Sequence, residues 1–120
     1  MYYTGSIKDQ KIKETRGYLC GAFKNAPIFS ERIEVAYMEA DELKKHINKK
    51  HHHNIIDEFC IVLRGFIEQE VDGNLLKIKE GDFIFQKAGS IEELKNIGDD
   101  TILLVIKSPS LPNDKVEDNN

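Results

Sequence analysis

The stretch HHHNIIDEFCIVLRG, residues 51–65, decides the fold of this 120-residue chain. It places His51 and His53 two positions apart and follows them with Glu58. Because residues two apart in a strand point to the same face, the two imidazoles share one face and His52 takes the other. A carboxylate that arrives from the next strand can complete one side of a coordination sphere. The stretch therefore predicts neighbouring strands that carry metal-ligand side chains.

A second stretch, GDFIFQKAGSIEELKN at residues 81–96, adds a further carboxylate at Glu92. Together with the glycine at position 65, the spacings in the two stretches resemble the two sequence motifs of the cupin superfamily. The resemblance covers about residues 51–96. It implies an all-β fold, a single antiparallel β-barrel of the jelly-roll type, with a site at its centre.

The two motifs match the family to different degrees. The first has both histidines, its glutamate and its closing glycine at family spacing, with Lys45 where the family usually has another glycine. In the second, Lys87 replaces the usual proline, and Glu92 stands where the family usually has a third metal-binding histidine. The ligand set that the resemblance implies here is His51, His53, Glu58 and Glu92.

The ligand types limit the metals that suit such a site. Imidazole nitrogen and carboxylate oxygen suit Fe(II), Mn(II), Ni(II), Co(II) and Zn(II), and the affinity order alone does not select among them. Two histidines and one carboxylate form the facial triad of non-haem iron sites, which leaves positions open for dioxygen and substrate. Adding Glu92 makes the site harder and more anionic, so we expect a divalent metal with Fe(II) favoured. The alternative is a polar strand edge whose histidines merely form hydrogen bonds.

The function expected from this site is that of a small metal-binding cupin acting on a small organic molecule. An oxygenase that uses Fe(II) is the first hypothesis, with Glu92 as fourth ligand or as general base. A metal-dependent sugar isomerase or epimerase is the second, with Glu92 moving a proton beside a metal-held carbonyl. A non-catalytic cupin that binds or senses a small ligand is the third, because fold membership does not decide function.

Composition indicates one soluble domain. Hydrophobic residues make up 40% and charged residues 32% of the chain, which is typical of a globular protein. The expected division is an N-terminal segment at 1–17, available for pairing with a partner subunit, a barrel at 18–108 and a polar tail at 109–120 whose end is mobile unless a partner chain holds it. Because barrels of this kind often pair their edge strands, we expect a homodimer.

Charge and targeting signals exclude other partners. The net charge of −4 does not suggest nucleic acid. The start of the chain, MYYTG, lacks the basic and apolar segments of a secretory signal, and no apolar run approaches about 18 residues. We therefore expect a cytoplasmic protein without membrane contact. Cys20 and Cys60 are too few for a disulfide framework, and we expect reduced thiols.

Short strands with intervening turns are expected along the chain. Stretches compatible with strands occupy 18–23 and 32–39, and a continuously apolar one occupies 101–106. The clearest turn is Asp72-Gly73 between two apolar runs, because this pair favours the positive φ angles of a tight hairpin.

The segment around Glu92 has two interpretations. Ser90-Ile91-Glu92-Glu93 is a capping box, which locally favours a short helix that ends at Gly98. The resemblance favours a strand instead. In a regular strand Glu92, Leu94 and Asn96 would face the barrel interior.

Overall fold

The structure, a computed structural model, describes residues 1–118 as strands joined by turns, with two short helices and one 3₁₀ turn. In that part of the chain no helix is long and apolar enough to cross a membrane. In chain order, the elements are α1 (Gln10–Glu14), β1 (Tyr18–Gly21), β2 (Ile28–Phe29), β3 (Glu34–Glu39), α2 (Ala40–Leu43), the 3₁₀ turn (Lys44–His46), β4 (His51–His53), β5 (Asp57–Arg64), β6 (Phe66–Val71), β7 (Asn74–Lys79), β8 (Phe83–Gln86), β9 (Glu92–Ile97), β10 (Ile102–Ser108) and β11 (Lys115–Glu117).

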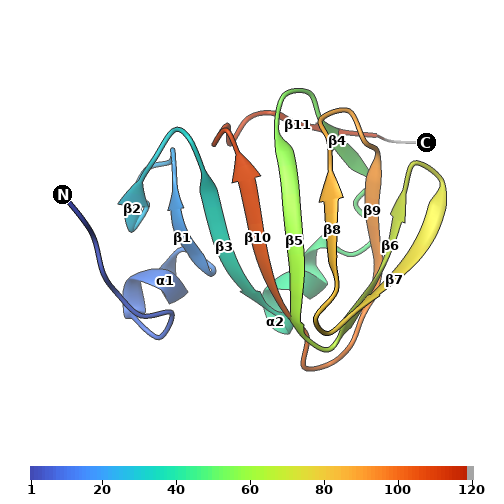
Figure 1. Ribbon diagram of the computed structural model, residues 1–120, viewed down its shortest axis with the longest axis horizontal. Helices are drawn as coiled ribbons and strands as arrows, with labels where there is room; N and C mark the ends of the chain where they lie inside the picture. The colour runs from blue at the N-terminus through green and yellow to red at the C-terminus, as the bar shows by residue number, and fades with distance from the viewer. Residues whose placement is uncertain (119–120) are drawn as a thin grey trace.

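The strands in the described residues form two sheets. One has the order β2-β1-β3-β10-β5-β8, and the other has the order β11-β4-β9-β6-β7. Figure 1 shows β1, β3, β10, β5 and β8 running side by side across the molecule. Neighbouring strands are antiparallel, apart from the parallel pair β1 and β2. The expected all-β jelly-roll fold is confirmed, as two sheets rather than one closed ladder.

The hairpin between β6 and β7 has the expected turn. Asp72 and Gly73 have φ angles of 50° and 83°, and their neighbours Val71 and Asn74 pair across it. Two successive positive φ values are those of a tight turn that matches the right-handed twist of the strands. This turn fixes the register of the whole hairpin, as the Asp-Gly pair predicts.

Strand alternation separates the interior into an apolar end and a polar end. On β5, the inward side chains of Cys60 and Val62 are apolar, and the inward side chain at the other end of the strand is Glu58. The inward side chains of the neighbouring strands β3 and β10 are likewise apolar at one end and charged at the other, where Glu34 and Lys107 lie. The buried core comprises Ala36, Met38, Ala40, Leu43, Cys60, Val62, Ile67, Ile78, Ile97, Leu103 and Val105. Because all three strands become polar at the same end, that end holds the candidate site.

The segment around Glu92 is a strand, so the helix that the capping box favours does not form. Glu92 is buried, as the strand interpretation requires. One part of that interpretation is wrong, because Asn96 is exposed and its amide bonds the Glu68 carboxylate. The pairing of β6 with β9 shifts register at an irregularity beside Gln69, which reverses the alternation so that Ile97 is buried in place of Asn96.

Both terminal segments pack on the sheets. In the N-terminal segment, the α1 residue Ile12 is buried. Within 109–118, Ser110 is buried and β11 pairs with β4. The described part of the expected tail therefore belongs to the fold, since backbone pairing and the Ser110 contacts outweigh its polar composition. The last two positions, 119 and 120, lie outside the described residues.

Candidate metal centre

Three expected ligands lie together at the polar end of the interior. His51 and His53 come from β4 and Glu92 from β9, and one ligand atom from each lies within 4.8 Å of the others. The register of the sheet causes this, because His51 and Glu92 are direct partners across β4 and β9. His52 points away, and its Nδ1 lies 2.8 Å from Oδ2 of Asp118. The structure therefore places His51 and His53 on one face of β4 and His52 on the other, as the alternation of a strand predicts.

The contacts of His51 orient its ring for a ligand. Its Nδ1 lies 2.8 Å from the carbonyl oxygen of Lys49. Because a carbonyl can only accept, Nδ1 carries the proton and Nε2 faces Glu92, at 3.1 Å from Oε1. Burial alone would lower the pKa of His51, but the hydrogen bonds to Glu92 and to the Lys49 carbonyl raise it. A backbone carbonyl on the outer nitrogen is the usual support of a metal-binding histidine.

His53 provides the strongest indication of a missing ligand. The residue is 6% exposed, and both ring nitrogens are buried without a hydrogen-bond partner among the described residues. The Oε1 atom of Glu58 lies 3.8 Å from Nε2, which is too long for a hydrogen bond. Burial, aided by the nearby charge of Lys107, lowers the pKa of His53 to about 4. The imidazole is therefore neutral at neutral pH, which is the form that binds a metal.

Glu58 lies beside this group and outside it. The group whose ligand atoms converge contains His51, His53 and Glu92, while Glu58 contacts its edge through His53. The residue is 8% exposed, and its carboxylate accepts a hydrogen bond from Nε2 of Gln86, at 3.2 Å. Burial and the charge of Glu92 raise the pKa of Glu58, against the opposite effect of Lys107. A carboxyl group of this kind can exist in both protonation states near neutral pH.

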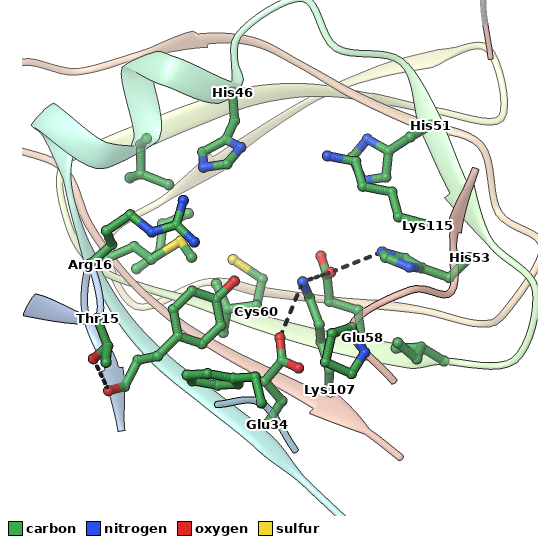
Figure 2. A pocket seen from close by; sticks show the side chains of 18 of the residues that line it. Thr15, Arg16, Glu34, His46, His51, His53, Glu58, Cys60, Lys107 and Lys115 are labelled. Atoms are coloured by element: carbon green, nitrogen blue, oxygen red, sulfur yellow. Dashed lines mark hydrogen bonds and ion pairs between the residues drawn. The ribbon is translucent and has the colours of Figure 1, made fainter. Parts of the chain in front are cut away.

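A row of polar side chains crosses the first sheet at the level of the site. Lys107 on β10 is the direct cross-strand partner of both Glu34 on β3 and Glu58 on β5. Its Nζ lies 3.8 Å from Oε1 of Glu34 and 3.9 Å from Oε1 of Glu58, as the dashed lines in Figure 2 indicate. Burial would lower the pKa of Lys107, but these carboxylates raise it. The ammonium is thus a fixed charge between two acids.

The same row continues to the opposite sheet. Gln86 on β8 pairs with Glu58 in register, and its side-chain carbonyl accepts a hydrogen bond of 2.8 Å from Nε2 of Gln69 on β6. Because Glu58 can only accept when ionised, the Gln86 amide must donate to it, and this fixes the orientation of both amides. The carboxyl group is therefore held by contacts from both sheets.

A cavity of about 530 Å³ opens in front of these groups. Figure 2 shows His46, His51, His53, Glu58 and Lys107 pointing into it. Its apolar floor includes Met38, Leu43, Leu103 and Val105. The cavity is large enough for a small organic molecule, which can reach the histidine pair and Glu58 at the same time.

Some residues of the site had no signal that the sequence analysis recognised. No sequence motif includes Lys107, Gln69 or Gln86. Lys107 nevertheless lies on the same face of β10 as the buried residues Leu103 and Val105. That alternation, read beyond the end of the apolar run, could have indicated an inward lysine. Lys115 lies in a segment that we expected to be a tail, so its place in the lining had no sequence signal.

Two further residues singled out by the sequence are less informative. Cys60 faces the cavity as expected, and burial raises the pKa of its thiol to about 12, so it is un-ionised. Lys87 is exposed and is absent from the cavity lining. Neither residue takes part in the chemistry considered below.

The donor set fits a divalent metal ion. Two imidazoles and one carboxylate converge, one histidine is oriented by a carbonyl, and the other has buried nitrogens without partners. The composition suits iron, manganese, nickel, cobalt or zinc. Metal coordination would satisfy one of the two buried ring nitrogens of His53, which otherwise carry the cost of burying polar atoms without partners.

Comparisons with known proteins agree with this fold. The family model described as Cupin domain matches residues 40–107. No curated protein matches the sequence. Among solved structures, KdgF from Halomonas sp. has a TM-score of 0.58 at 15% identity, covering 70% of this chain and 74% of that chain.

Two further structures have similar folds. PAC13 from Streptomyces, a nucleoside dehydratase seen with uridine, has a TM-score of 0.61 at 9% identity, covering 75% of this chain and 70% of that chain. The DMSP lyase DddQ from Ruegeria pomeroyi DSS-3 has a TM-score of 0.57 at 20% identity, covering 82% of this chain and 48% of that chain. At these identities the likeness concerns the fold alone.

Proposed function

Because this chain belongs to the cupin domain family, we propose that it is a metal-dependent enzyme that moves a proton on a small oxygen-bearing organic molecule. The observation that carries this proposal is Glu58, a buried carboxyl group beside the His51, His53 and Glu92 group and open to the same cavity. A carboxyl group with a raised pKa next to a metal site is well suited to general acid–base catalysis.

The proposed metal ligands are His51, His53 and Glu92. A divalent ion held there would act as a Lewis acid on a substrate oxygen. The Lys49 carbonyl orients His51, and the burial of His53 keeps its imidazole neutral. His53 is therefore a neutral ligand, His51 would bind through Nε2 after that atom releases its proton, and Glu92 supplies one negative charge.

Glu58 is the proposed proton-transfer group, a role that differs from the ligand role that the resemblance implies. The ionised carboxylate would accept a proton from a carbon next to the oxygen-bearing carbon. The resulting acid would return the proton, either to a neighbouring carbon in an isomerisation or to a departing oxygen in an elimination. Gln86 and Lys107 hold the carboxyl group in position through both states.

The structurally similar enzymes are consistent with this class of reaction. PAC13 is a nucleoside dehydratase and DddQ is a DMSP lyase. Dehydratases and lyases act by elimination, which requires proton transfer. Since those likenesses concern the fold, it is the position and burial of Glu58 that support proton transfer in this chain.

An Fe(II) oxygenase is the second candidate. The observation in its favour is the ligand set itself, because two histidines and one carboxylate are the donors of non-haem iron oxygenases. An oxygenase has no evident need for a second buried carboxyl group with a raised pKa. For this reason we rank proton transfer first.

Solvent-exchange and oxygen measurements on one panel of substrates test the two candidates. Small hydroxy acids, sugars and nucleosides are incubated in D₂O with the metal-loaded protein, and proton NMR follows deuterium uptake and product formation. We expect turnover without oxygen consumption, and loss of turnover in Glu58→Gln. Oxygen consumption that matches product formation would support the oxygenase. The absence of both would support a non-catalytic binding protein.

A further inference from the structure

The C-terminal strand β11 forms part of the wall of the candidate site. It pairs with the histidine strand β4, and Lys115 is the direct partner of His53. Directly opposite residues of an antiparallel pair lie on the same face of the sheet. Since His53 faces the cavity, Lys115 faces it too, and the cavity lining includes both residues.

Hydrogen bonds to two side chains of this segment hold it against β4 and against the loop that follows β4. The Asp114 carboxylate accepts backbone hydrogen bonds from Asn54, Ile55 and Ile56, at distances between 2.8 and 3.3 Å. Beyond the strand, Asp118 contacts His52. Lys115 lies between these two attachments, so the position of its backbone relative to the metal ligands is fixed.

Lys115 differs from Lys107, the other lysine beside the metal ligands, in its ion-pair partners. Lys107 is neutralised by Glu34 and Glu58, whereas no carboxylate among the described residues forms an ion pair with Lys115. Figure 2 shows its side chain reaching into the cavity in the region of His51. The residue is exposed to solvent, yet desolvation of its ammonium and the charge of Lys107 lower its pKa.

Arg16 and Lys24 also line the cavity and form no ion pair among the described residues, but Figure 2 shows Arg16 across the cavity from His51 and His53. The charges beside the metal ligands, by contrast, have partners. Glu34 and Glu58 engage Lys107, and Glu92 engages His51. Glu117 shares the β11 face with Lys115 but is absent from the cavity lining. Lys115 is exposed to solvent, so it does not need a partner, but its unpaired ammonium beside the metal ligands is available to form a charge-assisted hydrogen bond to a bound anion.

We propose that Lys115 binds the anionic group of the substrate, and that the substrate is a small organic anion carrying a carboxylate or a phosphate. The proposal rests on the proposed function for the presence of a metal site and adds the charge of the molecule bound there. It also assigns β11 a direct part in substrate binding.

Binding measurements with matched charged and neutral probes test this proposal. Malonate is compared with malonamide, and glycerol 1-phosphate with glycerol, by NMR titration of ¹⁵N-labelled protein with and without Zn(II). Lys115→Gln removes the charge, and Lys79→Gln, an exposed lysine of β7 outside the cavity lining, is the control. A lost charge-assisted hydrogen bond corresponds to a roughly tenfold weaker affinity.

The expected result is that at least one anion binds better than its neutral counterpart and that Lys115→Gln, unlike Lys79→Gln, loses about tenfold in affinity for it. Whether malonate or the phosphate responds identifies the anion. The proposal is overturned if neither anion binds, if the neutral probes bind equally well, or if Lys115→Gln binds as tightly as the parent. Metal content, measured separately by elemental analysis, tests the proposed function, and anion binding to metal-free protein tests Lys115 alone.

Discussion

His51 and Glu92 stand directly opposite each other across β4 and β9, with Nε2 of the histidine 3.1 Å from Oε1 of the glutamate. This contact joins the two sequence motifs in space. In the absence of metal it is a hydrogen bond, and the same two atoms are the ones that a shared ion would use. Together with the His53 ring beside it, this pair makes up the candidate metal centre.

The first prediction concerns the parity of the histidines. The double substitution His51→Ala with His53→Ala should abolish metal retention, because both converging imidazoles are removed. His52→Ala should retain the metal, since its ring contacts Asp118 on the other face. Elemental analysis of untagged, dialysed protein measures the outcome. Equal metal loss in both variants would contradict the claim that His51 and His53 bind the metal and His52 does not.

The second prediction separates the roles of the two buried carboxylates. Glu92→Gln should weaken metal affinity by about 100-fold, because it removes a ligand of the converging group. Glu58→Gln should leave metal affinity within a few-fold of the parent and lower turnover by at least about 100-fold. Metal titration with a competing chelator measures affinity, and the D₂O assay measures turnover.

Glu93→Gln is the matched control for these variants. Its side chain belongs to the opposite face of β9 and pairs with Lys95 at 2.8 Å. It should change neither quantity. If Glu58→Gln lost the metal as Glu92→Gln does, Glu58 would be a ligand, as the resemblance to cupins implies.

The sequence predicts those parts of the site that depend on local pattern. Alternation in a strand is enough to place His51 and His53 on one face and His52 on the other. The Asp72-Gly73 pair is enough to predict the hairpin, because it meets a backbone requirement that few other residues meet. The strand at Glu92 required the family resemblance, since its local capping signal favours a helix.

The parts that could not be predicted depend on contacts between distant segments. The register shift beside Gln69 exposes Asn96, and no residue near Asn96 signals it. The partners of Lys107 lie far away in the chain, on β3 and β5. Strand β11 forms because its backbone meets an open edge of β4, whereas its composition is that of a solvated tail.

The third prediction is acid destabilisation through His53. In the metal-free folded protein burial lowers its pKa to about 4 from an ordinary value of 6.5. A lowered pKa contributes stability that is present above pH 6.5 and is lost as the pH falls towards 4. The shift corresponds to roughly 3 kcal/mol of unfolding free energy.

Urea denaturation at several pH values, with a chelator present, measures this effect. Because the raised pKa of Glu58 acts in the opposite direction over this range, the prediction is a difference between two proteins. Lowering the pH from 6.5 to 4 should be more destabilising for the parent than for His53→Asn, because asparagine does not titrate. His52→Asn is the control and should lose as much as the parent. Identical pH dependence of the parent and His53→Asn would show that His53 titrates normally in the folded state.

The fourth prediction concerns Gly65, the closing glycine of the first motif. Its φ is +76°, and a Cβ there would lie 2.5 Å from Oγ1 and 2.9 Å from Cα of Thr101. Thr101 is fully buried and its hydroxyl bonds the carbonyls of Phe66 and Gly98, so it cannot move away. Gly65→Ala should therefore lower the unfolding free energy by about 3 kcal/mol or more.

Gly73→Ala separates the two causes of that loss. Gly73 has a similar φ of +83°, but a Cβ would meet nothing within 4 Å. Its substitution should cost only about 1 kcal/mol, from the backbone conformation alone. Equal losses of stability in the two variants, measured by urea denaturation, would mean that the contact with Thr101 is unimportant.

The central claim is that His51, His53 and Glu92 jointly hold a divalent metal ion. Anomalous diffraction from crystals of the metal-loaded protein, recorded on either side of the absorption edge of the metal, tests it most directly. We predict one anomalous peak in the cavity, within bonding distance of an imidazole nitrogen of each histidine and of a Glu92 carboxylate oxygen. A peak bound elsewhere, or a fully metal-loaded crystal without a peak at these three residues, would contradict the claim.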